Sequence, residues 1–205
     1  AKTIIIATGS HHRKLGIDGE DRLEGQGISY CAVCDGAFFR GKTVAVIGGG
    51  NSALQDAVLL SDGCEKVYIV QNLPFLTGEM SLQKILLDRQ NVEIITTSVV
   101  DKLIGNETLR GIEIKDVDTA ERRCLYLDGM FVCIGQKPEN EAFADMVGLD
   151  DRGYIISGED CLTRSDGGIF VAGDCRTKAV RQVTTATADG AVAALAACRI
   201  IDAGM

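Results

Sequence analysis

The sequence lacks the features that mark several classes of protein. It has no tryptophan and only two prolines. Its longest apolar runs, such as Ala191 to Cys198, end at a charge well before the roughly 18 residues that a membrane-spanning helix needs. Basic residues are in the minority, with 21 Lys and Arg against 29 Asp and Glu, and they form no stripe. We therefore expect neither a membrane nor a nucleic acid as a partner.

Cysteine is also too scarce for a scaffold held together by disulfides. Eight cysteines in 205 residues fall well below the roughly 8 to 10% typical of small disulfide-rich secreted proteins. No apolar export signal follows the first residue. These features predict a reduced, cytoplasmic protein. Because the chain starts at Ala1, without methionine and directly inside an apolar segment, we expect its original N-terminus to lie further upstream.

The hydrophobic pattern indicates an α/β fold. Apolar residues make up 46% of the chain, enough for a sizeable core. Short β-branched runs alternate with helical segments, which is typical of a doubly wound parallel sheet. From residue 43 the expected order is strand, helix, strand, helix, strand, over residues 43–47, 51–61, 66–70, 78–89 and 92–97. A further strand is expected at 4–6 and a loop over 10–29.

The pattern changes after residue 98. Three alternating segments, at 99–104, 109–116 and 122–127, predict a β-meander, and an apolar strand at 130–134 follows them. A second unit is expected to begin near Pro138, with a strand at 169–172 and a helix over about 182–202. The sequence thus predicts a three-layer nucleotide-binding domain of the Rossmann type with an added meander, and part of another domain.

A glycine-rich turn joins the strand at 43–47 to the next helix. Its pattern is Gly48-x-Gly50-x-x-Ala53, and Asn51 is expected to cap the helix. Gly48 permits a tight turn, Gly50 lets the backbone approach a pyrophosphate, and Ala53 keeps the helix close to the sheet. Free N–H groups at the helix start can then bind phosphate. In this strand-turn-helix context, dinucleotide binding is favoured over a turn that only packs.

The residues that would recognise the ribose of such a dinucleotide are neutral. About 20 residues after the glycines, an acidic side chain would bind the 2'-hydroxyl of NAD, or basic ones the 2'-phosphate of NADP. The second strand ends instead in Val70, Gln71, Asn72 and Leu73. The sequence therefore has the scaffold for a nicotinamide cofactor but lacks the charged residues that would distinguish NAD from NADP.

A cysteine pair, Cys31-Ala-Val-Cys34, precedes the glycine turn and is followed by Asp35. Such a pair can be half of a zinc site, a redox-active disulfide or two unrelated thiols. Zinc usually takes four ligands, no second pair has this spacing, and the adjacent His11 and His12 could hardly both complete a site. A redox pair needs no further ligand, and Asp35 could carry the proton of each exchange. We favour the redox disulfide over a metal, and we interpret the other six cysteines as small buried apolar residues.

A third constellation lies near the end of the chain. Gly173 and Asp174 follow the strand at 169–172, and Arg181 and Gln182 stand at the start of the last helix. A carboxylate at a strand end can bind a polyol, and a helix N-terminus can stabilise negative charge on a reduced ring. Taken alone the signal is weak, because an Asp after a strand is more often a turn or cap residue.

Taken together, these motifs resemble those of the low-molecular-weight thioredoxin reductases, which are flavoprotein disulfide oxidoreductases. The resemblance covers essentially the whole chain and rests on Ile5-Ile6-Ala7-Thr8-Gly9, Cys31-Ala-x-Cys34-Asp35-Gly36, Gly48-Gly-Gly50-Asn51-Ser52-Ala53, and Gly173-Asp174 with Arg181-Gln182. It implies a nicotinamide-binding domain over residues 14–135, inserted into an FAD-binding Rossmann-like domain. The parts of that FAD domain present here would be residues 1–13 and the C-terminal segment 136–205.

The resemblance also implies roles for individual residues. Cys34 would face the flavin, Cys31 would exchange with the protein substrate, and Asp35 would be the acid/base. The residues that would hold the nicotinamide cofactor are Gly48, Gly50, Asn51, Ser52 and Ala53, and those that would hold FAD are Gly9, Gly173, Asp174, Arg181, Gln182 and Val183. Electrons would pass from a nicotinamide donor through FAD to the disulfide and on to a thioredoxin-like protein. The full-length protein would be a homodimer.

Two departures from this family bear on function. The family's first glycine-rich motif would precede Ala1, so we expect the 205 residues alone to bind FAD poorly and to be inactive. The basic triplet that selects NADPH aligns with Gln71, Asn72 and Thr77, so we expect weak use of NADH, or another donor such as reduced ferredoxin. Two alternatives remain open: a non-catalytic dinucleotide-binding module with structural or metal-binding cysteines, and the flavoprotein part of a peroxide-reducing system.

Overall fold

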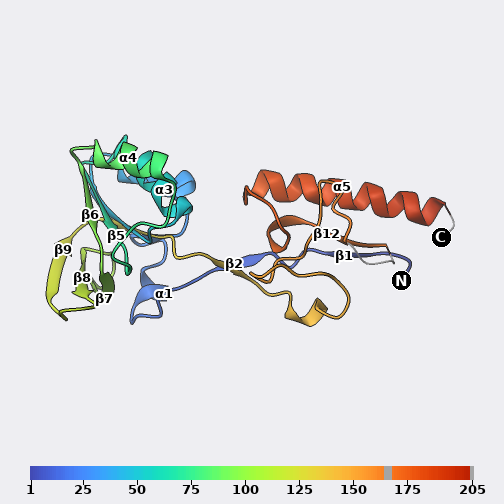
Figure 1. The fold of residues 1–205 in the computed structure, drawn as a ribbon, viewed down its shortest axis with the longest axis horizontal. Coiled ribbons are helices and arrows are strands. Elements are labelled where there is room, and N and C mark those ends of the chain that lie inside the picture. The colour runs from blue at the N-terminus through green and yellow to red at the C-terminus, as the bar shows by residue number, and fades with distance from the viewer. Residues whose placement is uncertain (164–167, 204–205) are drawn as a thin grey trace. The chain divides into compact units, whose positions relative to one another are not determined.

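The computed structural model describes residues 1–163 and 168–203. The chain divides into two compact units, one formed by Ala1–His12 with Gln136–Met205 and the other by Arg13–Gly135. The second unit is continuous in sequence and interrupts the first (Figure 1).

The Arg13–Gly135 unit is built on a five-stranded parallel sheet. Its strand order is β3-β10-β4-β5-β6. The strands are β3 (Ile28–Ser29), β10 (Gly129–Val132), β4 (Thr43–Ile47), β5 (Lys66–Val70) and β6 (Val92–Ile95). Successive residues of β4 and β5 are buried on both faces of the sheet, which explains their nearly continuous apolar sequences.

A layer covers each face of this sheet. Helices α3 (Asn51–Ser61) and α4 (Met80–Leu87) lie on one face, in a cluster with Val44, Val46 and Phe131 (Figure 1). An antiparallel meander packs on the other face, against Ala45 and Met130. Its strands are β7 (Ser98–Ile104), β8 (Gly111–Asp116) and β9 (Arg122–Tyr126). The expected three-layer α/β fold with a meander is confirmed.

The expectation of a loop over residues 10–29 is wrong. This segment contains β2 (Ser10–His12), the short helix α1 (Glu20–Leu23) and β3. The carboxylate of Glu20 is buried and accepts hydrogen bonds from the backbone amides of Leu15 and Gly16, which fixes the turn before α1. Strand β3 forms because a distant segment, β10, pairs with it. Such long-range pairing is not visible in a local polar, glycine-rich pattern.

The unit formed by the chain ends contains the other sheets. Strand β1 (Ile4–Ile6) pairs in parallel with β12 (Ile169–Val171), and β2 pairs antiparallel with β11 (Gln136–Pro138). Helix α5 (Val183–Asp202) packs its small residues, including Ala193 and Ala197, against Phe170 of β12. Figure 1 shows α5 running alongside β1 and β12.

Helix α5 is also the one helix in the described part of the chain with the length and composition of a membrane span. These criteria are weak grounds for a span, because core helices of soluble proteins can meet them. The helix carries Asp189, which is only 7% exposed and is bound by two cationic side chains.

The interpretation of six cysteines as buried is wrong for two of them. Cys64, Cys161 and Cys175 are buried and Cys133 is partly buried. Cys124 is exposed on β9, whose one buried residue is Leu125. Cys198 is exposed on α5.

Candidate redox and nucleotide-binding sites

The two cysteines of the Cys-x-x-Cys pair are joined by a disulfide. Cys31 is the N-cap of the short helix α2 (Ala32–Asp35), and its Sγ accepts the N–H of Cys34 at 3.1 Å. Cys34 is exposed and Cys31 is partly exposed. A disulfide exposed on a surface turn can be attacked by an external thiol.

Asp35 is tied to this turn through a residue that the sequence analysis did not single out. The hydroxyl of Ser29 donates to Asp35 Oδ2 at 2.7 Å and accepts the N–H of Cys31 at 3.1 Å. Ser29 is buried at the end of β3, so the strand positions both the cysteine and the carboxylate. A serine two residues before the cysteine pair is the only local signal that could have indicated this role.

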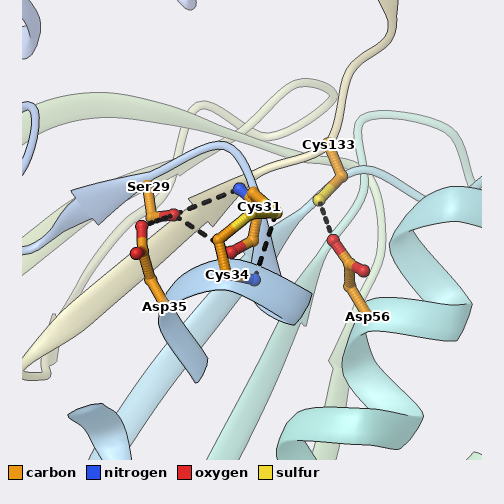
Figure 2. Close-up of a disulfide and its surroundings, with 6 residues drawn as sticks. All are labelled: Ser29, Cys31, Cys34, Asp35, Asp56 and Cys133. Atoms are coloured by element: carbon orange, nitrogen blue, oxygen red, sulfur yellow. Dashed lines mark hydrogen bonds between the residues drawn. A yellow bond between two sulfur atoms is a disulfide. The ribbon is translucent and has the colours of Figure 1, made fainter. Parts of the chain in front are cut away.

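A second carboxylate reaches the same turn from α3. Figure 2 shows Asp56 and Cys133 on the side of the disulfide opposite Asp35. The Cys133 thiol donates to Asp56 Oδ2 at 3.2 Å, and the backbone N–H of Ala32 faces the Asp56 carboxylate. Burial raises the pKa of Asp56, although both donors oppose that rise. Burial and the nearby Asp56 charge raise the pKa of Cys133, so its thiol is held protonated.

The glycine turn lies between β4 and α3. Gly48 has φ +128°, and a Cβ there would stand 2.5 Å from the carbonyl oxygen of Cys133. Gly50 is the N-cap of α3, and the buried Ala53 packs against the turn. The expectation that Asn51 caps the helix is wrong: Asn51 is the first helical residue. The Ser52 side chain is exposed at the helix start.

The side chain of Asn51 instead holds the loop that follows β5. Its Oδ1 accepts the N–H of Glu79 at 2.7 Å, and its Nδ2 donates to Glu79 Oε1 at 3.1 Å. The same loop binds the glycine turn directly, because the amides of Thr77 and Gly78 both donate to Gly49 O. The glycine turn and the loop after β5 therefore form one connected surface.

The three positions expected to select the nicotinamide cofactor carry no charge, and they differ in placement. Gln71 is 5% exposed and lies beneath the turn, since a Cβ on Gly49 would meet its side chain at 2.6 Å. The Thr77 hydroxyl donates to Gly49 O at 3.2 Å. Asn72 is exposed. Of the three, only Asn72 and Thr77 are therefore exposed.

In the unit formed by the chain ends, the parallel pairing of β1 and β12 brings two glycines to one edge. Gly9 follows β1 with φ +73°, and Gly173 follows β12 with φ +82°. Asp174 lies in the short helical turn Gly173–Cys175. Its Oδ1 is buried and has no hydrogen-bond partner among the residues that the structure describes. A buried carboxylate oxygen without a donor is costly, and a ligand hydroxyl would satisfy it.

The start of α5 lies in the same unit as this carboxylate. Gln182 is the N-cap and forms a capping box with Thr185, while Val183 is 80% exposed. The guanidinium of Arg181 stacks on the ring of Tyr154 at 4.1 Å. The unpartnered Asp174 oxygen, the glycines and the helix start fit the ribityl chain and ring of a flavin, with the adenosine part left to other segments.

Comparison with known proteins supports the resemblance read from the sequence. The pyridine nucleotide-disulphide oxidoreductase family model matches residues 1–190. A thioredoxin reductase of Listeria monocytogenes is 40% identical over 194 residues, covering 94% of this chain and 60% of that protein.

Two solved structures show the same fold. The thioredoxin reductase of Streptococcus pyogenes matches with a TM-score of 0.90 and 37% identity, over 99% of this chain and 66% of that one. A ferredoxin-flavin thioredoxin reductase of Clostridium acetobutylicum matches with a TM-score of 0.52 and 28% identity, over 98% of this chain and 63% of that one. The chain therefore spans less than two thirds of these relatives, and it belongs to the pyridine nucleotide-disulphide oxidoreductase family.

Proposed function

We propose that the whole protein is an FAD-dependent disulfide reductase of the thioredoxin reductase type, and that its Cys31–Cys34 pair reduces a thioredoxin-like protein. The observation that carries the proposal is the disulfide on an exposed turn, flanked by a carboxylate that a buried serine holds in place. The similarity to thioredoxin reductases supports it. By the same similarity, we propose a cytoplasmic homodimer.

The cysteines can carry out the exchange in two balanced steps. In the reduced pair, the Cys31 thiolate attacks one sulfur of the partner's disulfide, and the partner's other sulfur leaves as a thiolate. Cys34 then attacks Cys31 Sγ, which re-forms the disulfide and releases the partner with both sulfurs reduced. Asp35 would accept the proton of the attacking thiol and return it to the leaving one, while Ser29 holds its carboxylate beside Cys31.

The residues that would hold FAD lie in the unit formed by the chain ends. Asp174 would accept a hydroxyl of the ribityl chain at its unpartnered oxygen, and Gly9 and Gly173 would leave room for the cofactor. Gln182 and Val183, at the start of α5, and Arg181 would lie against the ring. When bound, the flavin supplies the two electrons that reduce the disulfide.

The electron donor is proposed to be a reduced ferredoxin, or NADH at low efficiency, rather than NADPH. The positions that would bind the 2'-phosphate are neutral, and Gln71 is buried beneath the glycine turn. Each missing charged contact costs about 1.5 to 3 kcal/mol of binding free energy. The loss of all three contacts therefore lowers the affinity for NADPH by several orders of magnitude. One similar structure is itself named a ferredoxin-flavin thioredoxin reductase.

The proposal is tested on the full-length flavoprotein under anaerobic conditions. NADPH, NADH and chemically reduced ferredoxin are mixed with it, flavin bleaching is followed by stopped flow, and reduction of a thioredoxin is measured with each donor. We expect C34S to retain flavin reduction and to lose thioredoxin reduction, while C124S, at an exposed cysteine remote in sequence from the pair, keeps both. Equal thioredoxin reduction by wild type and C34S would overturn the proposed function, and rapid bleaching by micromolar NADPH would overturn the choice of donor.

A gain-of-function variant tests the charge argument separately. The double substitution Asn72→Arg and Thr77→Arg places two cations at the exposed positions of the loop. Because each charged contact contributes about 1.5 to 3 kcal/mol, we expect the KM for NADPH to fall at least about a hundredfold. Asn106→Arg, on a turn of the meander, is the matched control and should leave that KM unchanged. An unchanged KM in the double variant would contradict the assignment of this loop as the selector.

A further inference from the structure

The redox turn has a carboxylate on each side, and only Asp35 is adjacent to the cysteines in sequence. Asp56 comes from the second turn of α3, and its partner Cys133 follows directly after β10. Ala32, which lies between the two cysteines, is 2% exposed and packs in the same cluster as Cys133. Three separate elements therefore meet beside the disulfide (Figure 2).

Asp56 lies beside the backbone of the redox turn. A buried carboxylate is stabilised when it accepts hydrogen bonds from nearby donors. The thiol of Cys133 donates to it at 3.2 Å, and the N–H of Ala32, the first residue of α2, faces it. The carboxylate is thus placed next to the peptide that follows Cys31.

We propose that Asp56 is a positioning residue of the Cys31–Cys34 pair: it faces the first amide of α2 and sets a negative charge beside Cys31, while the Cys133 thiol keeps the carboxylate in place. This inference rests on the proposed function, because it assigns Asp56 to the same disulfide reaction. The other titratable groups around Cys31 are Cys34, Asp35 and Cys133.

The charge has a direct consequence for the reduced pair. Reduction of the disulfide creates a thiol at Cys31 whose ionised form is negative, and a like charge nearby disfavours that form. Consecutive residues are about 3.8 Å apart between their Cα atoms, so a carboxylate that faces the amide of Ala32 lies close to Cys31. Disfavouring the thiolate makes the reduced pair a stronger reductant, since a disulfide is more oxidising when its reduced form is stabilised.

The test is the pH dependence of alkylation at Cys31. The purified protein is reduced, treated with iodoacetamide between pH 5 and 10, and mapped by mass spectrometry to follow each cysteine. In Asp56→Asn, which keeps the side-chain size and loses the charge, we expect the midpoint for Cys31 to move down by about one pH unit. Asp56→Glu should restore the wild-type profile. Asp62→Asn, at the exposed C-cap of the same helix, is the matched control and should not change it.

Two results would overturn the inference. One is an Asp56→Asn profile identical to that of wild type. The other is a disulfide joining Cys133 to Cys31 or Cys34 when the reduced protein is reoxidised in air before mapping, because Cys133 would then exchange rather than hold Asp56. A purely structural role would lower the unfolding midpoint of Asp56→Asn without moving the alkylation profile, and it would also count against the inference. The measurement needs no flavin, donor or partner, so failure of the proposed function would leave its outcome unaffected.

Discussion

Replacing Asp189 by Asn should strongly destabilise the unit formed by the chain ends. The carboxylate of Asp189, on α5, accepts four hydrogen bonds: from Gly173 N at 3.0 Å, from Arg176 Nε and Nη2 at 2.9 Å each, and from Lys178 Nζ at 2.8 Å. The side chains of Arg176 and Lys178 are only 5% and 7% exposed. Without the carboxylate, two buried cations would lack their counter-ion.

The magnitude follows from this burial. Removing one partner of a buried ion pair costs about 3 to 5 kcal/mol. We expect that loss in the free energy of unfolding of this unit, measured by urea denaturation with circular dichroism. Asp62→Asn is the control, because its ion pair with Arg89 is exposed and worth at most about 1 kcal/mol. A loss below about 1 kcal/mol in Asp189→Asn would refute the assignment of a structural role to the buried pair.

The same residue should make the free energy of unfolding fall at acidic pH. The hydrogen bonds from Arg176, together with those from Lys178 and Gly173, hold the pKa of Asp189 well below its usual range. The unfolded chain therefore binds the proton more readily than the folded one. The stabilisation by the Asp189 carboxylate is complete above its pKa in the unfolded chain, about 3.9. It is lost as the pH falls through its pKa in the folded protein. Wild-type stability should drop below about pH 4, and Asp189→Asn should lack this component.

Asp189 also connects stability to the proposed flavin site, since it accepts a hydrogen bond from the amide of Gly173, next to Asp174. In the full-length protein, Asp189→Asn should therefore lose flavin on gel filtration, seen as a lower ratio of visible to ultraviolet absorbance. Full flavin retention at wild-type levels would show that the turn after β12 keeps its shape without this contact.

Two further predictions concern the Arg13–Gly135 unit. Gly48→Ala should lower its free energy of unfolding by about 3 kcal/mol, because φ is +128° and the new Cβ would stand 2.5 Å from a carbonyl oxygen. Gly41→Ala, at φ +68° with nothing within 4 Å, is the control and should cost about 1 kcal/mol, so equal losses in urea denaturation would contradict the steric argument. Ser29→Ala removes the donor to Asp35 and the acceptor for the Cys31 amide. It should slow thioredoxin reduction by the proposed full-length enzyme at least about tenfold, the equivalent of one lost hydrogen bond to a charged group, and an unchanged kcat would show that Ser29 does not support Asp35.

Much of the fold could be predicted because its signals are local. The run Thr43–Ile47, the glycines after it and the amphipathic segment from Asn51 are contiguous, and each piece specifies its own geometry. The meander is visible for the same reason, since alternation with period two marks a half-buried strand. The strand within residues 10–29 has no such local signal, because Ile28 becomes a strand residue only when β10 pairs with it.

The cysteine pair, the glycine turn and the neutral positions after β5 follow from sequence order and spacing, because their chemistry depends on neighbours only a few residues away. The second carboxylate beside the disulfide cannot be predicted from sequence order and spacing. Asp56 and Cys133 are 77 positions apart and meet only because β10 inserts beside β4 in the sheet, which brings the end of β10 next to α3. The burial of Gln71 and the unpartnered oxygen of Asp174 likewise arise from packing between distant segments, which no local pattern of residues encodes.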